Sequence, residues 1–277
     1  MIKMNWIGVC AALGACTGAV AAEDMSREFK LPLQLAAFEA SPEAATAAYA
    51  RALSLLIQRS HGVDAGDASK PDKTRLVRFL DTPGTCTLRK AGFILRERAD
   101  DKRRQVTLKT RSPDSSWVMQ TRVDAPNAKS KLEEDISAPL EAKLSRSATL
   151  ALQGAAPASL EAASGLFPVL AALAARDEPL ETVEGLTVRE VGYQLPRWTS
   201  QGVGFEADLS LWYDSAGKLL FSEASFRYDV PAAGADNAAT QAAALFRAMQ
   251  ADASWAGTRS QTKTEFIYTA AGGKFCR

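Results

Sequence analysis

The sequence predicts an α+β protein built on a mainly antiparallel sheet of about eight strands. Short runs of alternating polar and apolar residues follow one another along most of the chain, separated by Pro, Gly, Asp and Asn clusters. A few segments have helical periodicity instead. Strands in succession, interrupted by two or three helical segments, indicate an α+β fold or a closed barrel.

The composition excludes several classes of protein. Of 277 residues, 47% are hydrophobic, which is enough to bury a sizeable core and excludes a wholly disordered chain. The 33 basic and 32 acidic residues give a formal charge of +1, so we expect no nucleic-acid partner. The sequence has one histidine and no GxSxG, Walker or HExxH motif, so no motif supports a serine hydrolase, a P-loop enzyme or a zincin.

Residues 1–22 have the layout of a secretory signal, with a basic start, an apolar core and small residues at the end. The run LGAC at 13–16 also resembles a bacterial lipobox, in which the cysteine becomes the lipidated first residue. Two expectations stay open: a soluble periplasmic or secreted protein, and a lipoprotein that contacts the membrane through an anchor at Cys16. Residues 23–277 are expected to form a single domain.

Removal of residues 1–22 leaves two cysteines, Cys86 and Cys276. In an oxidising compartment this pair is a candidate disulfide, and two unpaired thiols are the alternative. No CxxC motif is present, so a redox-catalytic pair is not expected.

The first half of the domain predicts a strand, a helix and a row of strands. Residues 26–31 alternate polar and apolar, as a strand does. Ser41 and Pro42 supply a capping hydroxyl and a proline at the first helical position, which predicts a helix to about Gln58. After a loop, the expected strands are 75–81, 92–99, 104–111, 116–123 and 131–136.

The second half opens with an Ala/Leu-rich segment, which predicts a helical insert at about 139–180. Asp214 to Gly217 then form a hairpin turn between two strands. The expected elements after the insert are strands at 186–195, 203–213 and 218–229, an amphipathic helix at 237–255 and a final strand at 262–269.

Almost every predicted strand carries charged side chains two residues apart, which share a face because strand side chains alternate. One interpretation is an open sheet with a wet face, on which opposite charges pair across strands. The other is a closed ring with the charged face inward. Such an interior must hold water, ions or a charged ligand, because desolvating an ion costs several kcal/mol. The charged rows include Glu28 with Lys30, Arg96 with Arg98, Lys109 with Arg111, Glu133 with Asp135, Glu206 with Asp208, Glu223 with Arg227, and Lys263 with Glu265.

In a closed ring, both signs of charge together suit a metal-bound polyphosphate. Arginine and lysine bind phosphate oxygens, and arginine can do so through two parallel hydrogen bonds. Carboxylates bind Mg²⁺ or Mn²⁺, which prefer oxygen ligands and bridge phosphates.

The run from Phe79 to Lys109 resembles the diagnostic stretch of CYTH domains, the triphosphate tunnel superfamily. It contains an Asp-Thr strand end, a Leu-to-Gly segment, an LRxR strand and a TLK strand, here residues 81–82, 88–92, 95–98 and 107–109. Three further segments are similar to the family's acidic strands and C-terminal lysine strand: KLEEDI (131–136), FSEASF (221–226) and TKTEF (262–266).

The resemblance implies an eight-stranded antiparallel β-barrel with peripheral helices, a divalent Mg or Mn ion, and inorganic triphosphate or polyphosphate as the bound partner. It assigns phosphate binding to the basic residues Lys30, Arg96, Arg98, Lys109, Arg111 and Lys263. It assigns metal binding to Glu28, Glu133, Asp135 and Glu223, of which Glu28 and Glu133 would also orient the attacking water in a triphosphatase.

Two positions depart from the family pattern. Ser26 stands where the opening ExExK signature has its first Glu, and Ser225 replaces the second acid of a later strand. Glu206 and Asp208 are the candidates to compensate. Two functions stay open: a metal-dependent triphosphatase, and a catalytically inactive envelope protein that uses the same barrel to bind an anion or a partner.

Overall fold

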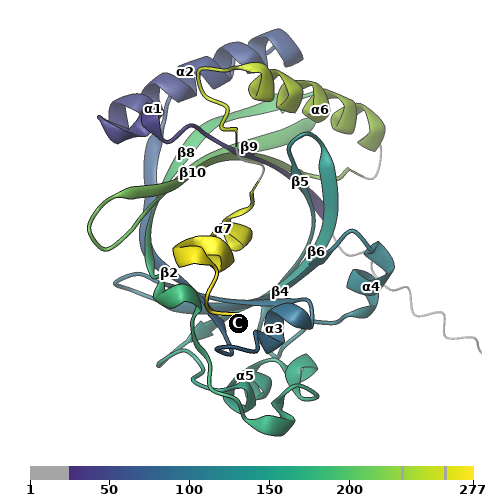
Figure 1. The fold of residues 1–277 in the computed structure, drawn as a ribbon. Coiled ribbons are helices and arrows are strands. Elements are labelled where there is room, and N and C mark those ends of the chain that lie inside the picture. Colours follow the sequence, from purple (N-terminus) through teal and green to yellow (C-terminus); the bar gives the residue numbers. More distant parts are fainter. Residues whose placement is uncertain (1–24, 232–233, 259–260) are drawn as a thin grey trace, which may run out of the picture.

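The computed structural model describes residues 25–231, 234–258 and 261–277 (Figure 1). The predicted signal at 1–22, including Cys16, lies outside the described residues. Within the described ranges, the helices are all too short or too polar to cross a membrane.

One sheet contains all ten strands found in the described ranges. They are β1 (Met25–Pro32), β2 (Lys70–Asp81), β3 (Phe93–Ala99), β4 (Arg104–Ser112), β5 (Lys129–Ser137), β6 (Glu141–Leu152), β7 (Glu181–Thr182), β8 (Val188–Ser200), β9 (Val203–Tyr213) and β10 (Leu219–Asp229).

The sheet closes on itself. Its strand order is β3-β4-β6-β5-β1-β10-β9-β8-β2-β7, and β3 also pairs with β2. The pairing of β3 with β2 completes a ring of strands. The two-residue β7 only pairs with the last two residues of β2. Figure 1 looks down the ring. The predicted α+β class is confirmed. The prediction of eight antiparallel strands is not confirmed, because the sheet has ten strands and β1 pairs with β5 in parallel.

The largest local difference is β6, at a position where the sequence predicts the start of a helical insert. Alanine and leucine favour a helix, which hides a weak alternation in the segment. Ser147 and Thr149 point into the ring, whereas Ala148 and Leu150 pack in the apolar cluster on its outside. The helical part of the insert is limited to α5 (Leu160–Leu166) and the short 3-10 turns Pro168–Leu170 and Ala174–Arg176, and a further 3-10 turn at Val183–Gly185 follows it.

Two predicted strands are helices. The 116–123 segment contains α4 (Ser115–Gln120), where the Asp114 side chain accepts a hydrogen bond of 3.1 Å from the backbone N–H of Trp117. The 262–269 segment is α7 (Lys263–Thr269), which begins with a capping box between Thr262 and Glu265. In both segments a capped helix start outweighs a short polar–apolar alternation.

Two long helices cover the outer face of β1, β8, β9 and β10, at the top of Figure 1. They are α2 (Pro42–His61) and α6 (Ala235–Ala251). α2 runs a few residues beyond the predicted end at Gln58 and is capped by Gly62 in the left-handed conformation, but the Ser41 side chain makes no capping hydrogen bond. Their apolar faces bury outward-pointing strand residues; Phe29, for example, stacks on Phe226 at 4.7 Å and meets Phe246 of α6 edge-on.

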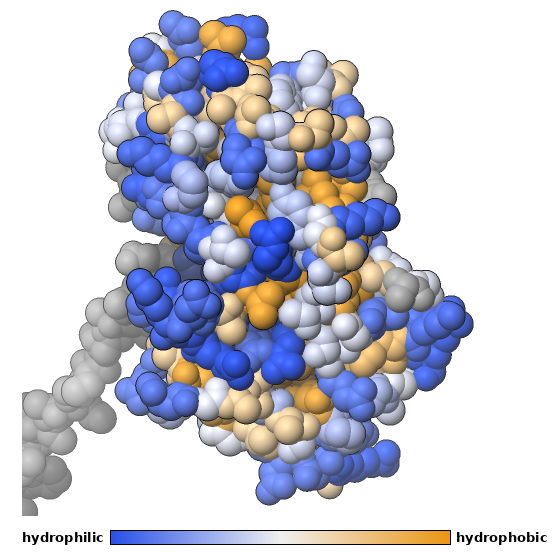
Figure 2. Space-filling view, turned by 90° about the vertical axis from the view of Figure 1, so that its left-hand side faces the viewer, coloured by the Kyte–Doolittle hydropathy of each residue, from blue (hydrophilic) through white to orange (hydrophobic). Residues whose placement is uncertain are grey.

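A lobe formed by residues 153–187 covers the outer face of β3, β4 and β6, at the bottom of Figure 1. The remaining short helices are α1 (Ala36–Glu39), α3 (Thr87–Lys90) and a 3-10 turn at Ala270–Gly272. Figure 2 shows hydrophilic and hydrophobic residues intermixed over one side of the molecule, with strongly hydrophilic residues also near its middle. Both outer faces of the ring are therefore partly covered, which leaves its interior for the charged rows.

The helix α7 lies inside the ring (Figure 1). Its Ile267 and Tyr268 pack with Val77, Phe79 and other inward-facing apolar residues in a cluster whose buried members are all at most 3% exposed. This cluster fills the end of the ring that contains the last residues of β2 and the first residues of β10. The ring is therefore closed at one end by its own C-terminal segment.

Candidate functional site

The charged rows meet inside the ring, beside α7, and line a cavity of about 250 Å³. Strand alternation places them there, because the residues between them form the outer apolar clusters. All but one of the predicted site residues line this cavity: Glu28, Lys30, Arg96, Arg98, Lys109, Arg111, Glu133, Glu223 and Lys263. The exception, Asp135, is hydrogen-bonded to three of them.

Positive charge dominates the cavity. Its lining in the described chain has seven basic and three acidic side chains, so the basic ones are in excess by four. Thr107, Ser147 and Thr149 add hydroxyl groups. A small, largely enclosed space with several net positive charges is suited to a compact polyanion.

Arg96 and Arg98, neighbours on the inner face of β3, have no ion pair with any described residue, and the buried Nε of each lacks a hydrogen-bond partner in the described chain. Burial, with repulsion from Arg75, lowers the pKa of Arg96 to about 10. Burial, with repulsion from Arg96 and Arg75, also lowers the pKa of Arg98. Buried, unpaired cations are costly unless an anion joins them.

Three carboxylates form the acidic part of the site. Glu28, Glu133 and Asp135 each place one oxygen within 4.8 Å of the others. Oxygen donors in this number suit Mg²⁺ or Mn²⁺, so these are the residues that would hold a divalent ion. Glu223, the fourth predicted ligand, instead pairs with Lys263, with 2.9 Å between Oε1 and Nζ.

Asp135 lies at the centre of the surrounding ion pairs. Its carboxylate accepts hydrogen bonds from Lys30, from Lys109 at 2.8 Å and from Arg111 at 2.8 Å. Burial alone would raise the pKa of Asp135, but attraction from these cations, Lys109 first, holds it well below its usual range. Burial likewise opposes ionisation of Glu28, and attraction from Lys30 outweighs it and lowers the Glu28 pKa to about 2. Glu28 and Asp135 are therefore ionised at neutral pH.

Lys263 reaches the cavity from a helix and not from the predicted strand. It is the first residue of α7, and its ammonium also donates a hydrogen bond to Ser210. The ring of Trp212 lies 5.3 Å from the ammonium. Thr262 and Thr264, on either side of Lys263, line the cavity with it.

Two interior residues escaped the sequence analysis. Glu190 on β8 pairs with Arg75 on β2 and accepts a hydrogen bond of 2.8 Å from the indole of Trp212. Burial opposes ionisation of Glu190, but attraction from Lys263 and Arg75 lowers its pKa strongly. The signal was the alternation of Val188, Glu190 and Gly192, which puts all three on one face.

The two candidates to replace the missing carboxylates do not line the cavity. Glu206 and Asp208 bind Arg227 instead. Glu206 and Arg227 line a larger hollow of about 770 Å³ around the β8–β9 hairpin. Ser26 is buried beside β5, paired in register with Glu133, and its hydroxyl has no partner in the described chain.

No protein-family model matches the chain, and no curated protein does. Among solved structures, the chain is similar to a candidate adenylyl cyclase from Hippeastrum described as having a dominant triphosphatase activity, at 15% identity and a TM-score of 0.43, over 87% of this chain and 94% of that one. It is also similar to a candidate adenylate cyclase from Bacillus halodurans, at 16% identity and 0.41, over 87% and 95%. A third similar structure is a protein from Pyrococcus horikoshii, at 9% and 0.36, over 87% and 97%.

Proposed function

We propose that this protein is a divergent triphosphate tunnel protein of the CYTH type, which binds inorganic triphosphate, or the end of a polyphosphate chain, inside its ring and hydrolyses it with Mg²⁺ or Mn²⁺. The observation that carries the proposal is the pair Arg96 and Arg98, which line a positively charged cavity inside the ring without an ion pair to an acidic residue in the described chain. A chain of phosphates supplies the missing negative charge, and arginine suits its oxygens.

The proposed reaction depends on positioning and charge neutralisation. A divalent ion at Glu28, Glu133 and Asp135 would neutralise charge on the phosphate oxygens. Arg96, Arg98 and Lys263, which line the same cavity, would bind the phosphates. Glu28 or Glu133 would accept a hydrogen bond from the attacking water and orient it.

The loss of acids at Ser26 and Ser225 favours a second candidate, a protein that binds the same anion without cleaving it. Phosphate release from tripolyphosphate, measured with and without Mn²⁺, distinguishes the two. The triphosphatase requires release that depends on the metal and stops in a Glu133→Gln variant. Tight binding in the absence of any release would establish the second candidate and refute catalysis.

The closed end of the ring predicts how polyphosphate binds. Because α7 and its apolar neighbours pack together at one end of the ring, we expect a chain of phosphates to enter but not to pass through. We therefore expect each linear polyphosphate to bind at most two protein molecules, one at each end, whatever its length. Analytical ultracentrifugation with chains of graded length tests this, and a number of bound proteins that grows with chain length would show that the chain threads through.

We further propose that the protein is exported, as the signal-like residues 1–22 suggest. The disulfide between Cys86 and Cys276 supports this, because such bonds persist in oxidising compartments. Fractionation of cells and mass spectrometry of the mature N-terminus test the proposal. Recovery of the uncleaved chain in the cytoplasm would contradict it.

A further inference from the structure

The C-terminal segment, residues 261–277, supplies part of the anion site without belonging to the sheet. Its helix α7 carries Lys263 to the cavity, where the ammonium lies 2.9 Å from the Glu223 carboxylate. The strands hold the other cations of the site through continuous backbone pairing. The position of Lys263 depends instead on the contacts that hold α7 inside the ring.

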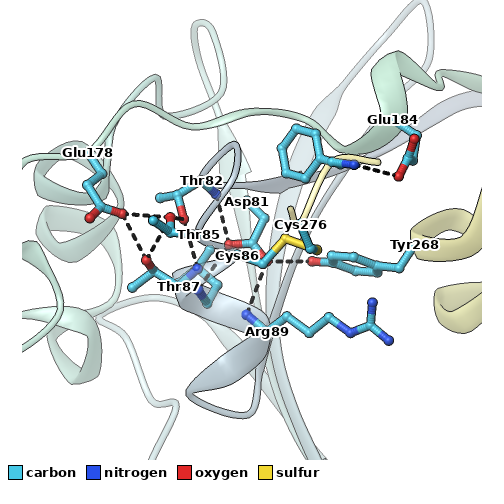
Figure 3. Close-up of a disulfide and its surroundings, with 12 residues drawn as sticks. Asp81, Thr82, Thr85, Cys86, Thr87, Arg89, Glu178, Glu184, Tyr268 and Cys276 are labelled. Atoms are coloured by element: carbon cyan, nitrogen blue, oxygen red, sulfur yellow. Dashed lines mark hydrogen bonds between the residues drawn. A yellow bond between two sulfur atoms is a disulfide. The ribbon is translucent and has the colours of Figure 1, made fainter. Parts of the chain in front are cut away.

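One attachment is a buried hydrogen bond at the end of β2 (Figure 3). The hydroxyl of Tyr268, on α7, donates to Asp81 at 2.8 Å. The Asp81 carboxylate is fully buried and also accepts hydrogen bonds from the backbone N–H groups of Thr82, Leu88 and Arg89. The guanidinium of Arg89 lies 4.4 Å from the centre of the Tyr268 ring. Asp81 is thus a rigid acceptor for the helix.

The second attachment is the disulfide. It joins Cys276, beyond α7, to Cys86 in the loop that follows Asp81 (Figure 3). The same loop also binds the C-terminal end of the chain through the backbone, since Gly84 N–H donates a hydrogen bond to the carbonyl of Phe275 at 2.7 Å. The Cys86–Cys276 disulfide agrees with the predicted pairing of the two cysteines and not with two free thiols. Both attachments hold the segment to residues 81–86.

We propose that the Cys86–Cys276 disulfide, together with the Tyr268–Asp81 hydrogen bond, positions Lys263 in the anion site, so that affinity for triphosphate depends on the oxidation of this disulfide. The proposal rests on the proposed function and adds its regulation. These four side chains are positioning residues, because they act on the anion only through Lys263.

The redox step balances with an external dithiol. The dithiol transfers two electrons and two protons, the sulfur–sulfur bond breaks, and Cys86 and Cys276 become thiols while the dithiol becomes a disulfide. Once the bond is broken, α7 keeps its apolar contacts and the hydrogen bond to Asp81 but loses its covalent attachment. Lys263 then spends less time at the anion.

The test compares the full-length wild type with a Lys263→Met variant, each in the oxidised and the reduced form. Tripolyphosphate affinity is measured by calorimetry, and alkylation with mass spectrometry verifies the thiol state. A Cys86→Ser/Cys276→Ser variant serves as the permanently reduced form. We expect reduction to weaken wild-type binding about tenfold, the value of one charge-assisted contact, and to change Lys263→Met by less than about twofold.

A merely structural disulfide gives a different pattern. It lowers the melting temperature in both backgrounds and weakens binding equally in both, which would overturn the proposal. Equal affinity of oxidised and reduced wild type would overturn it as well. If the oxidised wild type does not bind tripolyphosphate at all, the proposed function itself fails, so the two failures are distinguishable.

The hydrogen bond is tested by Tyr268→Phe, which keeps the packed ring and removes only the hydroxyl. We expect a loss of affinity of about threefold to tenfold in the oxidised protein, in line with one neutral or charge-assisted hydrogen bond. The same substitution in the Lys263→Met background should leave the affinity unchanged. A further loss there would place the effect of Tyr268 elsewhere in the site.

Discussion

Replacement of Arg96 and Arg98 together by methionine is expected to weaken tripolyphosphate binding by at least about 100-fold, since each charge-assisted contact contributes roughly 1.5–3 kcal/mol. The melting temperature is expected to stay the same or rise. The two side chains are half-buried with a buried Nε each, repel each other and Arg75, and have no ion pair in the described chain. Methionine fills most of the space without the charge.

Calorimetry and thermal melts measure the two quantities in the same samples. The matched control is Arg227→Met, because Arg227 is paired with Glu206 and Asp208 and does not line the cavity. Its affinity should stay within about twofold of the wild type, well under the 1.4 kcal/mol of a tenfold change. An affinity retained by the double variant would exclude the cavity as the anion site.

Replacement of Asp135 by alanine is expected to destabilise the free protein by about 3–5 kcal/mol, the usual cost of removing one partner from a buried ion pair. The carboxylate accepts hydrogen bonds from Lys30, Lys109 and Arg111. Without it, Lys30 would keep only Glu28, Lys109 only Glu133, and Arg111 no acidic partner in the described chain. A bound polyanion replaces the lost charge. Tripolyphosphate should therefore raise the melting temperature of this variant by more than it raises that of the wild type.

Thermal melts with and without tripolyphosphate measure both effects. Asp208→Ala is the control, since that carboxylate is a third exposed, pairs with Arg227 and does not line the cavity. It should lose little stability and show the wild-type response to the ligand. An Asp135→Ala variant as stable as the wild type would mean that the cluster of cations does not depend on this carboxylate.

The charged rows of the strands allowed most of the site to be predicted from sequence. Spacing of two, as in Arg96 with Arg98, fixes which side chains share a face, and closure of the ring brings the faces together. The direction of the face could not be predicted, because an open wet sheet has the same alternation. The pairing of β2 with β3 closes the ring, and closure turns the charged face inward.

The secondary-structure predictions that were wrong share a physical cause. In β6, alanines and leucines obscure the alternation of Ser147 and Thr149. The strand predicted at 262–269 is the helix α7, which begins with a capping box and also gains burial of Ile267 and Tyr268 inside the ring. That burial is a tertiary effect, which local sequence does not report. Lys263 nevertheless lines the cavity, as the first residue of α7.

Titration of the oxidised wild-type protein with tripolyphosphate by calorimetry, at low and then at rising salt, is the most direct measurement of the central claim. Inward-facing cations predict one anion per protein chain, an affinity that weakens as salt screens the charges, and loss of the signal in the Arg96→Met/Arg98→Met variant. Absence of heat from a folded protein at millimolar anion, or binding that survives in that variant, would contradict the account.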